Sequence, residues 1–166
     1  VGFLAAAHRP ARPALAVASD SGLVTVFEPN GERRMETRTR RPSQLALDDL
    51  DSDGENELVV AAAAGRLTVL EHDDSRQRTM RAQGAVSAIT LARSGQDVRV
   101  LAATRQGVES FEPRGAPLGL TPTLTPPDEV AVVDLDHDGQ LETVVRSSLG
   151  HIEIHGPGGG PPQQIR

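Results

Sequence analysis

The chain of 166 residues contains no cysteine, tryptophan, tyrosine or lysine. Without cysteine, a disulfide framework and a thiolate metal site are both excluded. Phenylalanine supplies all the aromatic side chains, at three positions, so a core has to be built from valine, leucine and alanine. No apolar run approaches the ~18 residues that a membrane span needs. The net charge of −6 argues against nucleic acid as a general partner, and the length is that of one domain.

Two short acidic segments, 49–57 and 134–142, repeat the same pattern of residues. Each has carboxylates at its positions 1, 3, 5 and 9 and a glycine at position 6. Hard oxygen ligands at this spacing, around a glycine that allows a sharp turn, suit a Ca²⁺ ion. Four carboxylates without a cation would repel one another, although a solvated acidic turn is the alternative interpretation. The sequence therefore predicts two calcium sites, whose carboxylates are Asp49, Asp51, Asp53 and Glu57 in one segment and Asp134, Asp136, Asp138 and Glu142 in the other.

An EF-hand loop begins in the same way, but it needs a bidentate glutamate at position 12 and a helix on each side. Counted from Asp49 and from Asp134, position 12 lies beyond each segment and is a valine, Val60 or Val145, within β-type sequence. We therefore expect the position-9 glutamates to close the two sites. The backbone carbonyls of Glu55 and Gln140 are expected as further ligands.

A glycine turn recurs roughly every 43 residues along the chain, at Gly22, Gly65, Gly107 and Gly150. An apolar stretch precedes each turn, and a stretch that alternates between apolar and polar residues follows it, which is typical of a β-hairpin. A further apolar stretch lies upstream of each hairpin, and a polar one follows it. Four short strands in each repeat are the pattern of a propeller blade.

The predicted fold class is all-β: a β-propeller of four four-stranded blades, at about 1–42, 43–85, 86–128 and 129–155. The Gly/Pro-rich tail, 156–166, is interpreted as a linker. Helical repeats are disfavoured because 16 glycines and 12 prolines interrupt the chain. We expect the four blades to close a small ring. The alternative is half of an eight-bladed ring, completed by a second copy in a homodimer or by further sequence.

The segments 47–60 and 132–145, in which an apolar strand leads into an acidic loop and a second strand follows, resemble the FG-GAP/VCBS repeats of integrin alpha-subunit-like propellers. The resemblance implies that each loop joins the first two strands of a blade and holds calcium. It gives ligand roles to the carboxylates named above, with glutamate at position 9 where the family more often has aspartate. The matching positions hold no such ligand set in the other two blades, where they are Ala6, His8, Pro10 and Ala14 in the first and Leu91, Arg93, Gly95 and Arg99 in the third.

Two other groups of residues could bind ligands. His151, Glu153 and His155 alternate along one predicted strand, a geometry that could hold a transition metal. We favour an ordinary solvent-facing strand. The arginines of segment 33–41 could bind phosphate or an acidic partner. The favoured interpretation is an outer strand of the first blade, where charge prevents edge-to-edge pairing.

The expected function is non-catalytic. The chain is expected to be a calcium-stabilised propeller that serves as a protein-interaction scaffold or as a subunit of an extracytoplasmic assembly. A lectin-like module is the alternative, although sugar recognition normally uses the aromatic rings that this chain lacks. An enzyme would need convergent acid and base groups, so the chain would at most be a non-catalytic part of one. Weak calcium affinity, about 10⁻⁴–10⁻³ M in extracellular modules, suits an extracellular, cell-surface or periplasmic location.

Overall fold

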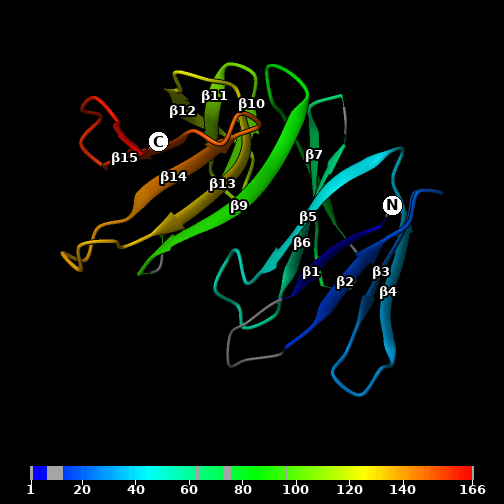
Figure 1. Ribbon diagram of the computed structural model, residues 1–166. Coiled ribbons are helices and arrows are strands. Elements are labelled where there is room, and N and C mark those ends of the chain that lie inside the picture. Colours follow the sequence, from blue (N-terminus) through cyan, green and yellow to red (C-terminus); the bar gives the residue numbers. More distant parts are fainter. Residues whose placement is uncertain (1, 7–12, 63, 73–75, 96, 166) are drawn as a thin grey trace.

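The computed structural model describes residues 2–6, 13–62, 64–72, 76–95 and 97–165. Within these ranges the chain is all-β and forms four antiparallel sheets of four strands each (Figure 1). The strands of the first two sheets are β1 (Phe3–Ala6), β2 (Leu15–Ala18), β3 (Leu23–Phe27), β4 (Arg33–Arg38), β5 (Pro42–Asp48), β6 (Glu57–Ala62), β7 (Arg66–Leu70) and β8 (Gln77–Arg81). Those of the other two are β9 (Val86–Ser94), β10 (Asp97–Thr104), β11 (Gly107–Phe111), β12 (Pro117–Pro122), β13 (Pro127–Val133), β14 (Glu142–Ser147), β15 (Ile152–His155) and β16 (Gln163–Ile165). The part of the chain that the structure describes contains no helix capable of crossing a membrane.

Each sheet is a blade whose strands follow one another in chain order, as the repeat predicts. The glycine turns join the second and third strands of each blade. Gly65 has a φ of 82°, and a Cβ atom there would lie 2.4 Å from the carbonyl oxygen of Gly84. Its own carbonyl accepts a hydrogen bond from the amide of Ala82 at 2.8 Å. The turn therefore needs glycine both for its left-handed backbone and for the close approach of the chain that leaves the outer strand.

Consecutive blades pack face to face, and the buried side chains between them are mainly valine, leucine and alanine, as expected. One core lies between the first and second blades and includes Val24, Val26, Leu45, Leu58 and Leu70. A second lies between the second and third blades and includes Val59, Leu67, Val69, Val100 and Phe111. A smaller cluster joins the third and fourth blades through Leu101, Val108, Val130, Val132 and Val145.

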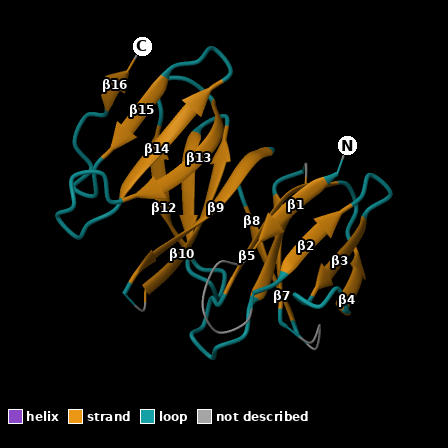
Figure 2. Ribbon diagram, turned by 60° about the horizontal axis from the view of Figure 1, so that its bottom comes forward, coloured by secondary structure: helices purple, strands orange, loops and turns teal. Residues whose placement is uncertain are grey.

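The blades are arranged around their first strands, β1, β5, β9 and β13, which lie side by side in chain order. Every extended contact between described strands of different sheets joins consecutive blades, and the first blade does not pack against the fourth. Figures 1 and 2 show these two blades at opposite ends of the molecule. The described residues thus form an open arc, and the prediction of a closed four-bladed ring is wrong. Because the ends do not meet, the four described blades together do not complete a circle.

The Gly/Pro-rich tail does not run on as a simple linker. It turns back after His155, and β16 pairs with β15 through Ile152 with Ile165, Glu153 with Gln164 and Ile154 with Gln163. The end of the tail therefore supplies the outer strand of the fourth blade. The arginine-rich segment forms the outer strand β4 of the first blade, as expected, and its Arg33 pairs with Glu36 at the surface.

Candidate metal centres

The two acidic segments occupy the same place in their blades. One connects β5 to β6 in the second blade, and the other connects β13 to β14 in the fourth. Their backbones match: position 4 is left-handed in both, at Ser52 (φ 66°) and His137 (φ 63°). The position-6 glycines, Gly54 and Gly139, also have positive φ, at 94° and 87°. Such values are uncommon outside glycine, so the shared pattern shows that the repeated sequence specifies one loop conformation.

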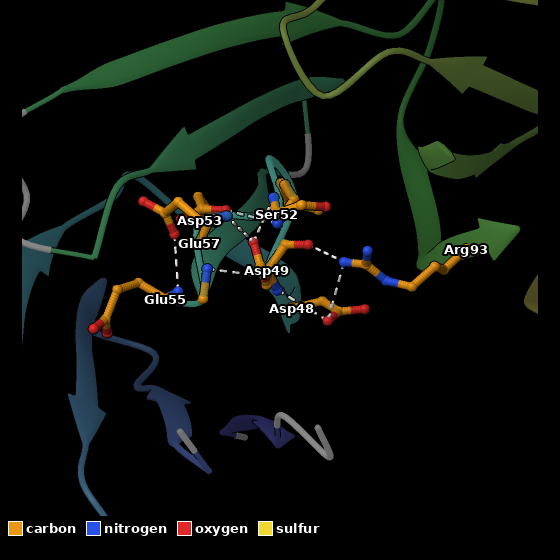
Figure 3. Close-up of polar contacts among 9 residues, drawn as sticks. Asp48, Asp49, Ser52, Asp53, Glu55, Glu57 and Arg93 are labelled. Atoms are coloured by element: carbon orange, nitrogen blue, oxygen red, sulfur yellow. Dashed lines mark hydrogen bonds and ion pairs between the residues drawn. The ribbon is translucent and has the colours of Figure 1, made fainter. Parts of the chain in front are cut away.

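The first aspartate organises each loop through hydrogen bonds to the backbone. Asp49 Oδ1 accepts hydrogen bonds from the amides of Ser52 at 2.7 Å and Asp53 at 3.2 Å, and its Oδ2 accepts one from Gly54 at 3.1 Å (Figure 3). In the other loop, Asp134 Oδ2 accepts a hydrogen bond from the amide of Gly139 at 3.0 Å. The turn thereby bends round the carboxylate at position 1.

Each loop gathers three carboxylates, and one oxygen from each lies within 4.8 Å of one oxygen from each of the others. They are Asp49, Asp51 and Asp53 in the second blade, and Asp134, Asp136 and Glu142 in the fourth. Two acidic clusters that could hold metal ions are therefore present at equivalent places. Like charges this close destabilise one another unless a cation or protons neutralise them.

The position-9 glutamate lies beneath each loop. Glu57 is fully buried, at 0% exposure, and its Oε2 accepts a hydrogen bond from the amide of Leu50 at 2.7 Å. Glu142 is also buried and accepts one from Leu135 at 2.8 Å. Burial raises the pKa of Glu57 to about 7; the Leu50 amide opposes this, and the charges of Asp51, Asp53 and Glu71 add to it.

Two carboxylate oxygens in these loops are buried without a hydrogen-bond partner. One is Oε1 of Glu57, and the other is Oδ1 of Asp134. A buried acceptor that lacks a donor is unfavourable, so such groups call for an explanation. A cation in the second loop would satisfy Asp134 Oδ1, which belongs to the cluster there, and a cation in the first loop that also reached Glu57 would satisfy its Oε1. The donor sets therefore fit a hard divalent metal ion.

The predicted ligands are not gathered equally. Asp138 lies outside the second cluster, and its carboxylate accepts hydrogen bonds from the backbone amide and the side-chain Nε2 of Gln140, at 2.8 and 3.1 Å. Glu57 is not among the three closest carboxylates of the first cluster. The amide of Glu55 donates to Asp53 Oδ1 at 2.8 Å. Ligation by the carbonyls of Glu55 and Gln140 stays a prediction.

Sequence reasoning missed a contact between the first loop and the next blade. Arg93, on β9, donates a hydrogen bond through Nη2 to the carbonyl oxygen of Asp49, and its guanidinium lies 3.6 Å from Asp48 Oδ1 (Figure 3). The strand register places Arg93 level with Asp49, the first ligand aspartate of the second blade, because Leu91 pairs with Val100 as Leu47 pairs with Leu58. A basic residue at a lost ligand position was the signal that could have revealed it. The matching positions His8 and Pro10 of the first blade lie outside the described residues.

The expected solvent-facing strand at residues 151–155 is wrong for two of its three polar residues. Glu153 and His155 are buried, because this face of the fourth blade packs against the third. Glu153 accepts hydrogen bonds from the amides of Leu124 and Thr125, at 3.0 and 3.2 Å, and contacts His155 Nε2 at 3.2 Å. His151 is exposed, so the three side chains do not form a metal site. Glu153 instead fixes the connection between the two blades.

Comparison with known proteins supports the architecture. No protein-family model matches the chain, and no curated protein matches it. Among solved structures, the computationally designed Ika4 protein matches with a TM-score of 0.68 and 12% identity, over 92% of this chain and 89% of that one. BBS1N, in a mercury-soaked crystal of its complex with ARL6DN, matches with a TM-score of 0.68 and 16% identity, over 93% of this chain. The chain spans half the length of BBS1N. At such identities these matches show the propeller-like fold alone.

Proposed function

We propose that this chain is a non-catalytic propeller module in which two Ca²⁺ ions stabilise equivalent loops, so that the blade ends present a fixed surface to a protein partner. The observation that carries the proposal is the repeated cluster of carboxylates with a buried oxygen lacking a donor in each loop. The resemblance of both loops to FG-GAP/VCBS repeats supports calcium as the ion. Oxygen-only ligands favour Ca²⁺ or Mg²⁺ over transition metals.

In the second blade, Asp49, Asp51 and Asp53 would hold the ion, with Glu57 and the carbonyl of Glu55 completing the site. In the fourth blade the holding residues would be Asp134, Asp136 and Glu142, with Asp138 and the carbonyl of Gln140. The ion supplies positive charge where the loops concentrate negative charge. Two Ca²⁺ ions would offset most of the net charge of −6.

Flexible loops with several carboxylates favour Ca²⁺ over Mg²⁺, since Mg²⁺ demands near-ideal octahedral geometry and loses its water reluctantly. Affinities of about 10⁻⁴–10⁻³ M would leave the sites filled outside the cytoplasm and largely empty within it. We therefore place the module in an extracellular, cell-surface or periplasmic setting. Calcium that binds only the folded chain stabilises it by mass action.

Thermal unfolding in EGTA, in Ca²⁺ and in Mg²⁺ tests the proposal. At a hundredfold excess over Kd, each Ca²⁺ ion should raise the free energy of unfolding by about 2.7 kcal/mol, which corresponds to roughly 5 to 10 °C in Tm. Asp49→Asn with Asp51→Asn should remove the contribution of one site, and Asp134→Asn with Asp136→Asn that of the other. Glu36→Gln, on the surface of β4, is the matched control. A melting temperature that is the same in EGTA and in about 10–100 mM Ca²⁺, a hundredfold excess over a Kd of about 10⁻⁴–10⁻³ M, would overturn the calcium proposal.

A further inference from the structure

Both ends of the arc carry a blade face that no described residue covers. Between consecutive blades, one face is formed by Leu45, Leu58, Val60 and Leu70 of the second blade, all at most 7% exposed beneath the first blade. The strand register identifies the equivalent positions of the first blade, because Leu15 pairs with Phe27 there as Leu58 pairs with Leu70 in the second blade. We call this kind of face the leading face.

On the first blade the leading face is built from Leu4, Leu15, Val17 and Phe27. Leu4 is 68% exposed and Leu15 is 37% exposed, while Val17 and Phe27 are half-buried. Their counterparts in the second blade are equally apolar and lie in the core. The leading face of the first blade therefore has the composition of a buried interface, and no described residue covers it.

The opposite face, which we call the trailing face, shows the same contrast. In the second blade it contains Val59, Leu67, Val69 and Met80, all at most 2% exposed against the third blade. Pairing of Leu67 with Met80 corresponds to pairing of Ile152 with Ile165 in the fourth blade. There the trailing face contains Val144, Ile152, Ile154 and Ile165, of which Ile165 is 52% exposed and the others are half-buried. It also carries one ion pair, because Arg146 takes the position of Ala61 and pairs with Glu129.

We propose that the leading face of one copy packs on the trailing face of a second copy, and the reverse, so that two arcs close a ring of eight blades. The two faces are the two halves of the interface that already recurs three times within the chain, so the new contact continues an established one. Propellers of 4–8 blades are typical, and two four-bladed arcs fall within that range. A head-to-tail contact made twice about a two-fold axis leaves neither face exposed. This inference does not depend on calcium.

Size-exclusion chromatography with light scattering, in Ca²⁺ and in EGTA, tests the inference on the chain itself. The expected mass is twice the 17.6 kDa of one chain. Leu15→Glu on the leading face, or Ile154→Lys on the trailing face, should each give a monomer. Leu4→Glu and Ile165→Glu are second variants of the two faces, at more exposed positions that disturb folding less. Leu118→Glu, at a 46% exposed position on β12 of the third blade and so outside both faces, should leave the dimer intact.

Mixing the two single variants separates head-to-tail from head-to-head pairing. The Leu15→Glu chain keeps an intact trailing face and the Ile154→Lys chain an intact leading face, so the mixture should form a 1:1 complex that neither variant forms alone. A monomer for the unchanged chain at high concentration would overturn the inference. So would a dimer that persists in either single variant, because that result requires a different interface.

Discussion

Glu57 Oε2 lies 2.7 Å from the amide nitrogen of Leu50, and it ties the last ligand position of the loop to the second residue of the same loop. The equivalent distance, between Glu142 Oε2 and the amide nitrogen of Leu135, is 2.8 Å. The position-9 glutamate is therefore a structural part of each loop. Its second oxygen, Oε1 in Glu57, is left buried and without a partner, which gives calcium a place to act.

Glu57→Gln should separate these two roles. The amide oxygen of glutamine can still accept the hydrogen bond from Leu50, while the negative charge is lost. In EGTA at pH 8 we expect the variant to be more stable than the parent, because no buried charge remains. In Ca²⁺ we expect its affinity to fall by roughly 10–100-fold, the range found when a partner that supports a metal site is removed. Calorimetric titration and thermal unfolding measure the two effects, with Glu36→Gln as the control.

The same carboxylate predicts a pH dependence of the metal-free chain. The pKa of Glu57 is about 7 in the folded chain, against the ordinary glutamate value of 4.5, so folding favours its protonated form. Its contribution to stability is fully present below about pH 4.5 and is lost as the pH rises through 7. In EGTA, the free energy of unfolding of the parent should therefore fall relative to that of Glu57→Gln between pH 5 and pH 8. Urea unfolding across this range provides the measurement. Parallel curves for the two proteins would contradict the assignment.

Gly65→Ala tests the close approach at the hairpin turn of the second blade. The new methyl group would lie 2.4 Å from the carbonyl oxygen of Gly84, at a backbone φ of 82° that alanine disfavours. We expect the free energy of unfolding, measured with urea, to fall by about 1–3 kcal/mol. Gly84→Ala is the matched control, because its φ is not positive and a Cβ there would meet no atom within 4 Å. A similar loss in both variants would show that the close approach is not the cause.

Arg93→Met should weaken the join between the second and third blades. The change removes a largely buried guanidinium that bonds to the carbonyl of Asp49 and neutralises Asp48. Hydrogen bonds that involve charged groups contribute roughly 1.5–3 kcal/mol to stability, and we expect the free energy of unfolding to fall by an amount of that order. Arg33→Met provides the comparison, since Arg33 pairs with Glu36 at the exposed edge. This change should lower the free energy of unfolding by less than about 1 kcal/mol. Equal effects of the two changes would argue against a joining role for Arg93.

The sequence alone determined the blades and the position of the acidic loops. Strand alternation, the glycine turns and the carboxylate spacing are local patterns, because a strand needs only its own periodicity and a tight turn only its own glycine. For the same reason the two acidic segments fold into one loop conformation. Their neighbours along the chain are enough to specify it.

Tertiary structure decided what depends on contacts between blades. The turn from one blade to the next follows from how two faces of valine, leucine and alanine fit together, so the open arc could not be predicted from the repeat. The burial of Glu153 and His155, and the reach of Arg93 to the loop of another blade, come from packing between residues distant in the chain. A period of about 43 residues predicts that blades exist, but only the fit of their side chains sets how many complete a ring.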